Sequence, residues 1–341
     1  MTLPKRRVGK TKLEVTTIGL GGAPMSGFRV AISEADALAL TDATYELGVR
    51  YFDTAPAYGY GRSELRMGSG LRDKPRDSFV LSTKVGRVVH AMKPGERPTT
   101  DFRENGLPGF APAFDYTYDG VMRSIEHSCM RLGLSRIDIV LVHDVDFWTT
   151  KDRALLDERF KTVMDSGFKA LDELRRAGLI GAIGVGIAES DTSLRFMQAG
   201  DFDCMLLAGR YTLLEQGALE AFLPECVKRN VSVILGGPYN TGILAGEVKP
   251  GDRHNYMPAA HALIDKAQKI EAVCRRHGAE LGAAALQFPL FHPALCAVIP
   301  GSISIARVKQ NVERLSAAIP VELWSELKHE KLLDASAPTP N

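Results

Sequence analysis

The feature of the sequence that most restricts its fold is an alternation, repeated eight times, of a short apolar run with a longer helical pattern. The apolar runs are rich in Val, Ile and Leu, as expected for parallel strands whose two faces are both buried. In chain order they are TTIGL, RYFDT, FVLSTKV, IDIVLVH, GAIGV, FDCMLL, VSVILGG and LCAVIPG. Helical patterns follow them near residues 34–47, 62–72, 119–132, 156–177, 191–198, 217–229, 258–277 and from about 304.

The ends of the expected helices carry suitable residues. Ser33 followed by two acids is typical of a helix start, and four glycines lie where helices should stop, at positions 48, 133, 178 and 278. No break in composition separates the eight units. They therefore predict an α/β fold in which residues 1–341 form one closed (β/α)8 barrel, preceded by a short hairpin made of RRV and LEV.

One segment, residues 88–118, interrupts the alternation. It is rich in proline and glycine, has no clear period, and carries several aromatic residues, among them Phe102, Phe110, Phe114 and Tyr116. Loops this long in a compact domain are usually functional. We expect an active-site loop whose aromatic side chains cover the barrel mouth.

Polar residues end three successive strand patterns. Asp53 ends the second, Lys84 the third and His143 the fourth, while Tyr58 lies in the loop after Asp53. Because the C-terminal ends of barrel strands meet at one mouth, these side chains should converge there. A lysine beside a tyrosine favours the phenolate, an aspartate would hold the lysine charged, and the histidine would position a substrate oxygen. The set predicts a proton-transfer site.

Each of these residues also has an ordinary structural explanation. A single aspartate at a strand end often caps a helix, a loop tyrosine often packs, a lysine after a strand is usually exposed, and a histidine is often a core residue. Their joint occurrence at the same end of adjacent strands favours the functional interpretation. The compact HDVD at 143–146 lacks distant partner ligands, so we expect no metal site.

These residues lie in motifs that resemble the aldo-keto reductase superfamily. The motifs are DTAPAYGYGRSE (53–64), STKVGR (82–87), RLGLSRIDIVLVHD (131–144) and IPGSISIARVKQN (299–311). The resemblance spans about residues 5–320. It implies a (β/α)8 barrel, a catalytic tetrad of Asp53, Tyr58, Lys84 and His143, and hydride transfer between a nicotinamide and a carbonyl or alcohol carbon.

The last strand and helix suggest where a dinucleotide binds. The chain runs through Gly301 and Ser302 into a helix whose first N–H groups can meet a phosphate. Arg307, Gln310 and Asn311 follow on that helix and are expected to reach the adenosine end. The resemblance implies that some strongly NADP-preferring members of the family carry Lys where this chain has Gly301. Its absence removes a charge-assisted bond of roughly 1.5–3 kcal/mol, so NAD is the expected cofactor, with NADP as the alternative because Arg307 remains.

The sequence departs from the family pattern where the nicotinamide ring should lie. Gly186-Ile187 stands where many members have Ser-Asn, Ala208 replaces a glutamine, and Gly236-Gly237 replaces a stacking tyrosine. Tyr239 and Arg210 are candidates to compensate, so Gly237, Tyr239 and Arg210 join the expected cofactor site. Phe147 and Trp148 follow His143 and, with Phe114, are candidate walls of the substrate pocket; packing beneath the long loop is an equal alternative.

Three further stretches resemble one branch of the superfamily, which contains D-threo-aldose (L-fucose) 1-dehydrogenases and pyridoxal 4-dehydrogenase. They are GGPYNTGIL, AGRYTLLEQ and DYTYDGVMRSIE. The resemblance implies NAD(P)-dependent oxidation of a cyclic hemiacetal, either pyridoxal or an aldose such as L-fucose, to a lactone. An NADPH-dependent aldehyde or ketone reductase and a non-catalytic, nicotinamide-binding regulatory barrel are the alternatives.

Composition narrows the choice of partners. The 42 Lys and Arg nearly balance the 41 Asp and Glu, for a formal net charge of +1, which gives no support to nucleic acid or a membrane surface as partner. No run of 18 apolar residues is present, and five cysteines without CxxC spacing suit a reducing compartment. We expect a cytoplasmic protein acting on a small molecule; whether it forms a homo-oligomer is left open.

Overall fold

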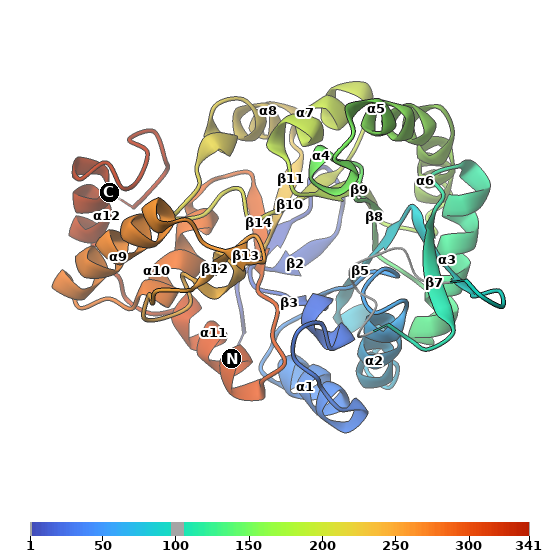
Figure 1. Ribbon diagram of the computed structural model, residues 1–341, viewed down its shortest axis with the longest axis horizontal. Coiled ribbons are helices and arrows are strands. Elements are labelled where there is room, and N and C mark those ends of the chain that lie inside the picture. The colour runs from blue at the N-terminus through green and yellow to red at the C-terminus, as the bar shows by residue number, and fades with distance from the viewer. Residues whose placement is uncertain (1, 97–105, 341) are drawn as a thin grey trace.

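The structure, a computed structural model, describes residues 2–96 and 106–340. Its centre is a parallel sheet of eight strands in the order β14-β11-β10-β9-β8-β5-β4-β3 (Figure 1). Parallel bridges between Ile18 and Val298 and between Gly21 and Gly301 join the first strand to the last. The predicted (β/α)8 barrel is thereby confirmed. The strands are β3 (Leu20–Gly21), β4 (Tyr51–Asp53), β5 (Val80–Val85), β8 (Ile139–His143), β9 (Ala182–Ile187), β10 (Cys204–Ala208), β11 (Ser232–Gly236) and β14 (Leu295–Ile299).

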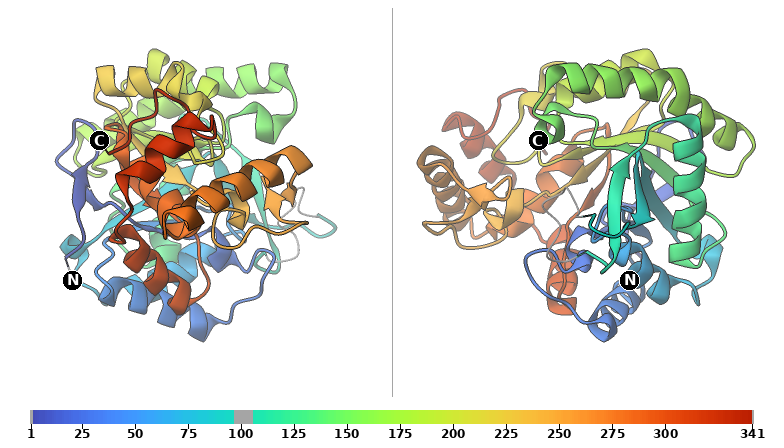
Figure 2. Two further views of the ribbon diagram at one scale, coloured as in Figure 1. Left: turned by 90° about the vertical axis from the view of Figure 1, so that its left-hand side faces the viewer. Right: turned by 45° about the vertical axis from the view of Figure 1, so that its right-hand side comes forward.

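Helices surround the barrel, and the C-terminal ones cover one side of it (Figures 1 and 2). The four glycines expected to end helices have φ between 64 and 90°, the left-handed conformation that stops a helix. The helices are α1 (Glu34–Glu46), α2 (Arg62–Leu71), α3 (Tyr118–Leu132), α4 (Phe147–Thr150), α5 (Arg153–Thr162), α6 (Phe168–Arg176), α7 (Ser190–Ala199), α8 (Phe222–Arg229), α9 (His261–Arg276), α10 (Leu281–Gln287), α11 (Ile305–Leu315) and α12 (Val321–His329). A π-helical turn, Val163–Gly167, joins α5 to α6.

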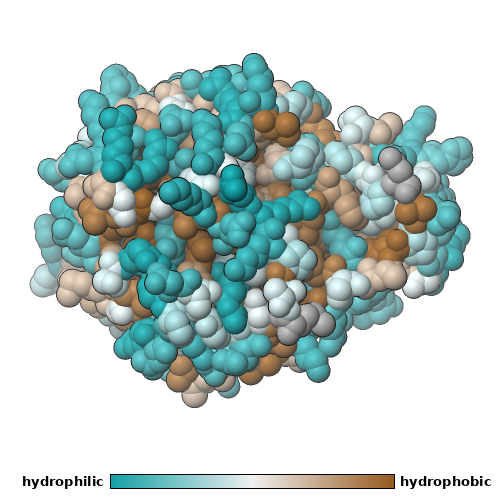
Figure 3. Space-filling model, turned by 180° about the vertical axis from the view of Figure 1, so that it is seen from behind, coloured by the Kyte–Doolittle hydropathy of each residue, from teal (hydrophilic) through white to brown (hydrophobic). Residues whose placement is uncertain are grey.

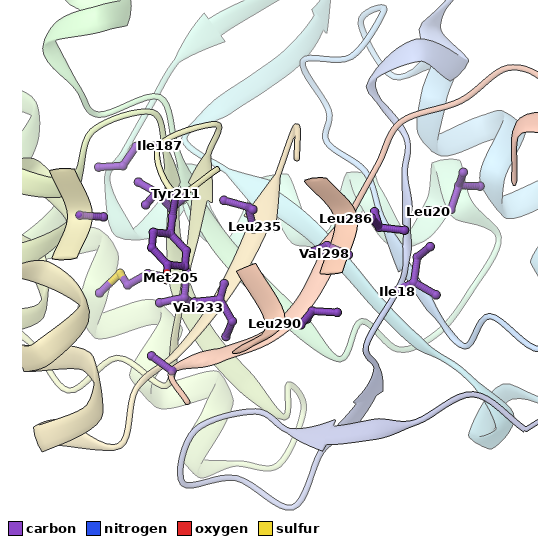
Figure 4. Close-up of a cluster of buried hydrophobic side chains, with 14 of the residues drawn as sticks. Ile18, Leu20, Ile187, Met205, Tyr211, Val233, Leu235, Leu286, Leu290 and Val298 are labelled. Carbon is purple, nitrogen blue, oxygen red and sulfur yellow. The ribbon is translucent and has the colours of Figure 1, made fainter. Parts of the chain in front are cut away.

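Apolar side chains fill the barrel below its mouth. Tyr51, Leu141, Leu206 and Ile234 belong to this inner cluster. The predicted N-terminal hairpin, β1 (Lys5–Arg7) with β2 (Glu14–Thr16), closes the opposite end and is confirmed. A second layer packs between the sheet and the helices, with side chains such as those labelled in Figure 4. Each fully buried aliphatic side chain contributes about 1.5–3 kcal/mol, so the fold can hold polar groups at the mouth.

Residues 88–118 are more ordered than predicted. β6 (Arg87–Ala91) pairs antiparallel with β7 (Phe110–Phe114), and this hairpin stands beside α3 (Figure 2). Pro112 suggested an irregular loop, but a two-stranded ribbon has only edge strands, where proline is tolerated. Val88, Val89 and Ala111 are buried and hold the ribbon in place. Phe102 and the rest of 97–105 lie outside the described residues.

A second short hairpin, which the sequence did not reveal, follows β11. It pairs β12 (Arg253–His254) with β13 (Met257–Pro258). The face of the molecule seen from behind is largely hydrophilic, and the hydrophobic residues on it are separated by polar ones (Figure 3). No helix among residues 2–96 and 106–340 is long and apolar enough to cross a membrane.

Candidate active site

Asp53 and Lys84 form a buried ion pair at the mouth, because they end the adjacent strands β4 and β5. Lys84 Nζ donates to Asp53 Oδ2 at 2.8 Å and to the Thr54 carbonyl at 2.8 Å. Ser82 donates to the other carboxylate oxygen at 2.7 Å. Burial lowers the pKa of Lys84, but Asp53 and Tyr58 outweigh burial and raise it above its ordinary value. The ammonium therefore stays charged and fixed.

Tyr58 lies beside this pair, in the loop after β4. Lys84 Nζ is 4.8 Å from the centre of the Tyr58 ring. Burial raises the pKa of Tyr58 to about 12, while the charge of Lys84 and its hydrogen bond act in the opposite direction. Lys84 thus favours the phenolate, as the sequence predicted, but burial outweighs it. The hydroxyl keeps its proton in the free protein at neutral pH.

His143 completes the group from the end of β8. Its ring meets that of Tyr58 edge-on, with 5.7 Å between centroids. Burial, together with the charges of Lys84 and Arg87, lowers the pKa of His143 to about 3, although Asp144 opposes this. The imidazole is therefore neutral at physiological pH. The structure brings together all four side chains that the sequence singled out.

Two residues missed by the sequence reasoning also line this corner of the mouth. Asp144 Oδ1 is 3.3 Å from His143 Nε2, and Arg87 Nη1 donates to Asp144 Oδ2 at 2.5 Å. Both residues lie in motifs that were noticed, STKVGR and LVHDVD. For Asp144 a signal was available in the sequence, because this acid directly follows His143, a candidate catalytic residue at the end of a strand.

The opposite half of the mouth carries almost no side chains. By the alternation of strand residues, Gly186, Ala208 and Gly236 face inward at the ends of β9, β10 and β11. We call these three small residues the open floor of the mouth. Gly186 pairs in register with His143, so the open floor lies directly beside the four polar side chains. The departures from the family pattern leave these three positions with nothing larger than a methyl group, which suits the approach of a planar ring.

The start of α11 suits a phosphate. No side chain caps this helix at Ser304, so its first N–H groups have no side-chain acceptor. Ser302 is occupied within its own turn, where its hydroxyl accepts the Ser304 N–H at 3.0 Å. Arg307 is exposed on the first turn and has no partner among the described residues. Together these groups fit the anionic part of a dinucleotide.

The other residues expected at the cofactor site connect α11 to neighbouring loops. The Tyr239 hydroxyl donates to Asn311 Oδ1 at 2.7 Å, and Gln310 Nε2 donates to Glu280 Oε1 at 3.3 Å. Gly237 has φ 60° with open space around it. Arg210 donates to the Ala188 carbonyl at 2.9 Å, which places it beside the open floor.

Gly301 is exposed, but the direction in which a side chain would leave it is blocked by another segment. A Cβ placed on Gly301 would lie 2.7 Å from Pro24 Cγ and 2.8 Å from Pro24 Cδ, closer than real Cβ contacts. Pro24 belongs to a short 3-10 helix, Ala23–Ser26, that follows β3. Position 301 therefore accepts no side chain unless this segment moves.

The aromatic residues expected at the pocket take different positions. Phe147 packs against the core at the start of α4, whereas the Trp148 side chain is 40% exposed. Glu189 fixes α4 by accepting the N–H groups of Phe147 at 3.0 Å and Trp148 at 2.8 Å. Trp148 is thus available at the rim, and Phe147 supports it from below.

The expected aromatic cover is only partly correct. Phe110 and Phe114 line a cavity of about 860 Å³ between the β6–β7 hairpin and α3, and none of the four convergent side chains lines it. Phe114 also lies under Arg159, 3.7 Å from its ring centre. Tyr116 is buried, and its hydroxyl donates to the His143 carbonyl at 2.8 Å. The aromatic residues of this segment therefore lie beside the mouth of the barrel and do not cover it.

Comparison with known proteins agrees with this geometry. The family model described as the aldo/keto reductase family matches residues 17–329. The chain belongs to the aldo/keto reductase family. The resemblance noted in the sequence is thereby confirmed. As a member of this family, the chain is an NAD(P)-dependent oxidoreductase.

Two curated aldo/keto reductases are similar over nearly the whole chain. Pyridoxal 4-dehydrogenase of Microbacterium luteolum is 40% identical, covering 96% of this chain and 98% of the relative. D-threo-aldose 1-dehydrogenase of a Pseudomonas species is 38% identical, covering 96% of each. Among solved structures, an aldo-keto reductase of Bacillus halodurans in its holo form superposes with a TM-score of 0.74 at 24% identity, covering 98% of both chains. That likeness supports the barrel fold.

Proposed function

We propose that this aldo/keto reductase oxidises a cyclic hemiacetal to a lactone, with NAD as the preferred cofactor and Tyr58 as the proton-transfer group. The substrate class is pyridoxal or an aldose such as L-fucose. The observation that carries the proposal is the half-buried Tyr58 side chain, whose ring centre lies 4.8 Å from the Lys84 ammonium and whose ring meets the neutral His143 ring edge-on. The two similar relatives are both named as dehydrogenases, which supports oxidation as the direction of the reaction.

The four side chains suit the removal of a proton from a hydroxyl. A hydroxyl donates one hydrogen bond and accepts others, so the substrate oxygen can donate to Tyr58 while accepting from His143. As the O–H bond breaks, its proton passes to the Tyr58 oxygen and a C=O bond forms. Lys84, held by Asp53, stabilises the phenolate form that accepts the proton.

The cofactor would lie between α11 and the open floor. The N-terminus of α11 and Arg307 would hold its phosphates, and Gly186, Ala208 and Gly236 would leave room for its ring. When bound, the oxidised nicotinamide accepts the hydride that leaves the anomeric carbon. Preference for NAD follows from Gly301, where Pro24 excludes the cationic side chain that would bind a 2′-phosphate.

The test follows reduced nicotinamide after mixing the protein with NAD+ or NADP+ and one of pyridoxal, L-fucose, L-galactose or D-arabinose. We expect turnover of one substrate, faster with NAD+. Tyr58→Phe should lower kcat at least a thousandfold, within the range lost with a general acid–base group, while NAD+ still binds by calorimetry. Tyr45→Phe is the matched control, because it also removes one tyrosine hydroxyl, which lies 2.8 Å from Ser78 Oγ and away from the mouth.

Two outcomes would overturn the proposal. One is reduction of simple aldehydes by NADPH without oxidation of any of the four substrates. The other is hemiacetal oxidation that survives in Tyr58→Phe as well as it does in Tyr45→Phe.

A further inference from the structure

Asp144 has a left-handed backbone conformation, and its side chain points toward the ring of His143. It directly follows His143, and its φ of 58° lies in the left-handed region, which is costly for most residues but tolerated by Asp. This turn carries the carboxylate back over the end of β8, within 3.3 Å of His143 Nε2. Arg87, from the neighbouring β6, holds it there. An uncommon backbone conformation at the mouth of a barrel suggests that the Asp144 carboxylate has a functional role.

The two ring nitrogens of His143 lie in different surroundings. Nδ1 is buried and has no hydrogen-bond partner among the described residues, whereas Nε2 lies beside the Asp144 carboxylate. A neutral imidazole carries one proton. A proton on Nδ1 would be a buried donor without an acceptor, while a proton on Nε2 is attracted by an anion that can only accept. The charged groups facing this ring are Lys84, Arg87 and Asp144, and Tyr58 is the remaining titratable neighbour.

We propose that Asp144 is a positioning residue that keeps the proton of neutral His143 on Nε2, so that His143 donates a hydrogen bond to the substrate oxygen. Tyr58 is then free to act as the acceptor of the substrate proton. Without Asp144, the proton would divide between the two nitrogens, and the fraction on Nδ1 would present a lone pair to the substrate. The kinetic consequence rests on the proposed function, whereas the position of the proton does not.

The chain supplies a matched control at the other end of the same strand. Asp138 directly precedes β8, is buried, and pairs with Arg76 at 2.6 Å, as Asp144 pairs with Arg87. It also accepts the Leu81 N–H at 2.8 Å and lies far from the mouth. Losing either carboxylate removes an Asp–Arg pair, but only Asp144 lies against His143.

The experiment compares Asp144→Gly, Asp144→Asn and Asp138→Asn with the unaltered chain. Glycine and asparagine both tolerate the left-handed backbone, so these changes remove charge without adding strain. Protein labelled with ¹⁵N-histidine is observed by NMR without substrate, because protonated and bare ring nitrogens resonate far apart. The His143 signals are assigned by their loss in His143→Gln. Steady-state kinetics are then measured with whichever of the four candidate substrates is turned over in the assay described under the proposed function.

We expect a protonated Nε2 and a bare Nδ1 in the unaltered chain and in Asp138→Asn. Asp144→Gly should show Nδ1 partly protonated and a kcat lowered about tenfold to hundredfold, the usual effect of losing a residue that orients a functional group. In Asp144→Asn the amide oxygen can still accept a hydrogen bond, so its Nδ1 protonation and its kcat should lie between those of the unaltered chain and those of Asp144→Gly. The proposal is overturned if Nδ1 is protonated in the unaltered chain, or if Asp144→Gly matches Asp138→Asn in both measurements. The NMR result stands even if no substrate is turned over, which separates this failure from failure of the proposed function.

Discussion

At the scale of single residues, the chemistry of the mouth depends on opposing effects at Tyr58. Burial raises the pKa of its hydroxyl to about 12, and Asp53 and Asp144 act in the same direction, while Lys84 lowers it. In the proposed oxidation, Tyr58 accepts a proton from the substrate, so the reactive fraction is the phenolate. The rate should therefore rise with pH throughout the neutral and moderately alkaline range. Each positive charge near the ring moves that rise to lower pH.

Removing Lys84 should shift the alkaline rise of the rate to higher pH. Lys84→Met alone would leave Asp53 buried and unpaired, which typically costs 3–5 kcal/mol of stability, so the double variant Asp53→Asn/Lys84→Met is preferred. Without the ammonium, the pKa of Tyr58 rises and the phenolate becomes rarer at any given pH. We expect kcat/KM at pH 8 to fall about a hundredfold or more.

The measurement is the pH dependence of kcat/KM from pH 6 to 10, with thermal unfolding as a check on the fold. A shift of the rise to lower pH, or an unchanged profile, would contradict the role given to Lys84. The matched control is Asp138→Asn/Arg76→Met, which removes a buried ion pair from the opposite end of the barrel. It should change stability but leave the pH profile in place.

The convergence of the four candidate residues could be predicted from the sequence because it depends only on strand order. Residues that end adjacent parallel strands must share a mouth. The contribution of Asp144 could not be predicted this way. Its direction depends on a positive φ and on Arg87, which reaches it from the hairpin; neither follows from strand order.

At the scale of elements, two segments far apart in sequence pack together at the proposed cofactor site. The 3-10 helix containing Pro24 packs on Gly301, just before α11 begins. A proline ring is rigid and cannot move aside as a flexible side chain can. Packing against Pro24 is thus sufficient to explain the absence of a side chain at position 301.

A lysine at position 301 should be tolerated only when Pro24 is also changed. We expect Gly301→Lys to destabilise the protein by about 1–3 kcal/mol, the usual cost of overpacking, and to weaken binding of both cofactors. In the Pro24→Ala background the same lysine should reach a 2′-phosphate and raise NADP+ affinity relative to NAD+ about tenfold or more.

Calorimetric Kd values for NAD+ and NADP+, with unfolding curves, complete the double-mutant cycle. The coupling between the two sites measures the clash directly. Equal effects of Gly301→Lys with and without Pro24→Ala would show that Pro24 does not limit this position.

The element scale is also where sequence reasoning was least complete. The eight strand–helix units follow from long, regular patterns, whereas β6, β7, β12 and β13 have two to five residues each. Pro112 lies within β7, in a segment expected to be a loop, and Pro258 lies within β13, so the helix expected over 258–277 begins only at His261. The ribbons are instead stabilised by contacts with the barrel that no local pattern encodes.

At the scale of the whole molecule, the barrel buries two histidines far apart in the structure. Burial lowers the pKa of His143 at the mouth to about 3, and burial lowers that of His292, before β14, to about 4. In the unfolded chain both would titrate near about 6.5. Below that pH the unfolded chain binds protons that the folded protein does not, so stability is complete above pH 6.5 and is lost as the pH falls.

His292→Asn should make the protein less sensitive to acid. Asparagine can keep the contact in which His292 Nδ1 accepts the Ala294 N–H at 3.2 Å, but it does not titrate. Relative to the unaltered chain, the variant should retain about 3 kcal/mol more of its unfolding free energy between pH 7 and pH 4. Urea unfolding at a series of pH values measures this difference, and carboxylates common to both proteins cancel. His329→Asn is the control for the substitution itself, because it replaces an exposed histidine on α12. If His292→Asn and the unaltered chain lose stability in parallel, His292 is not a source of acid sensitivity in this barrel.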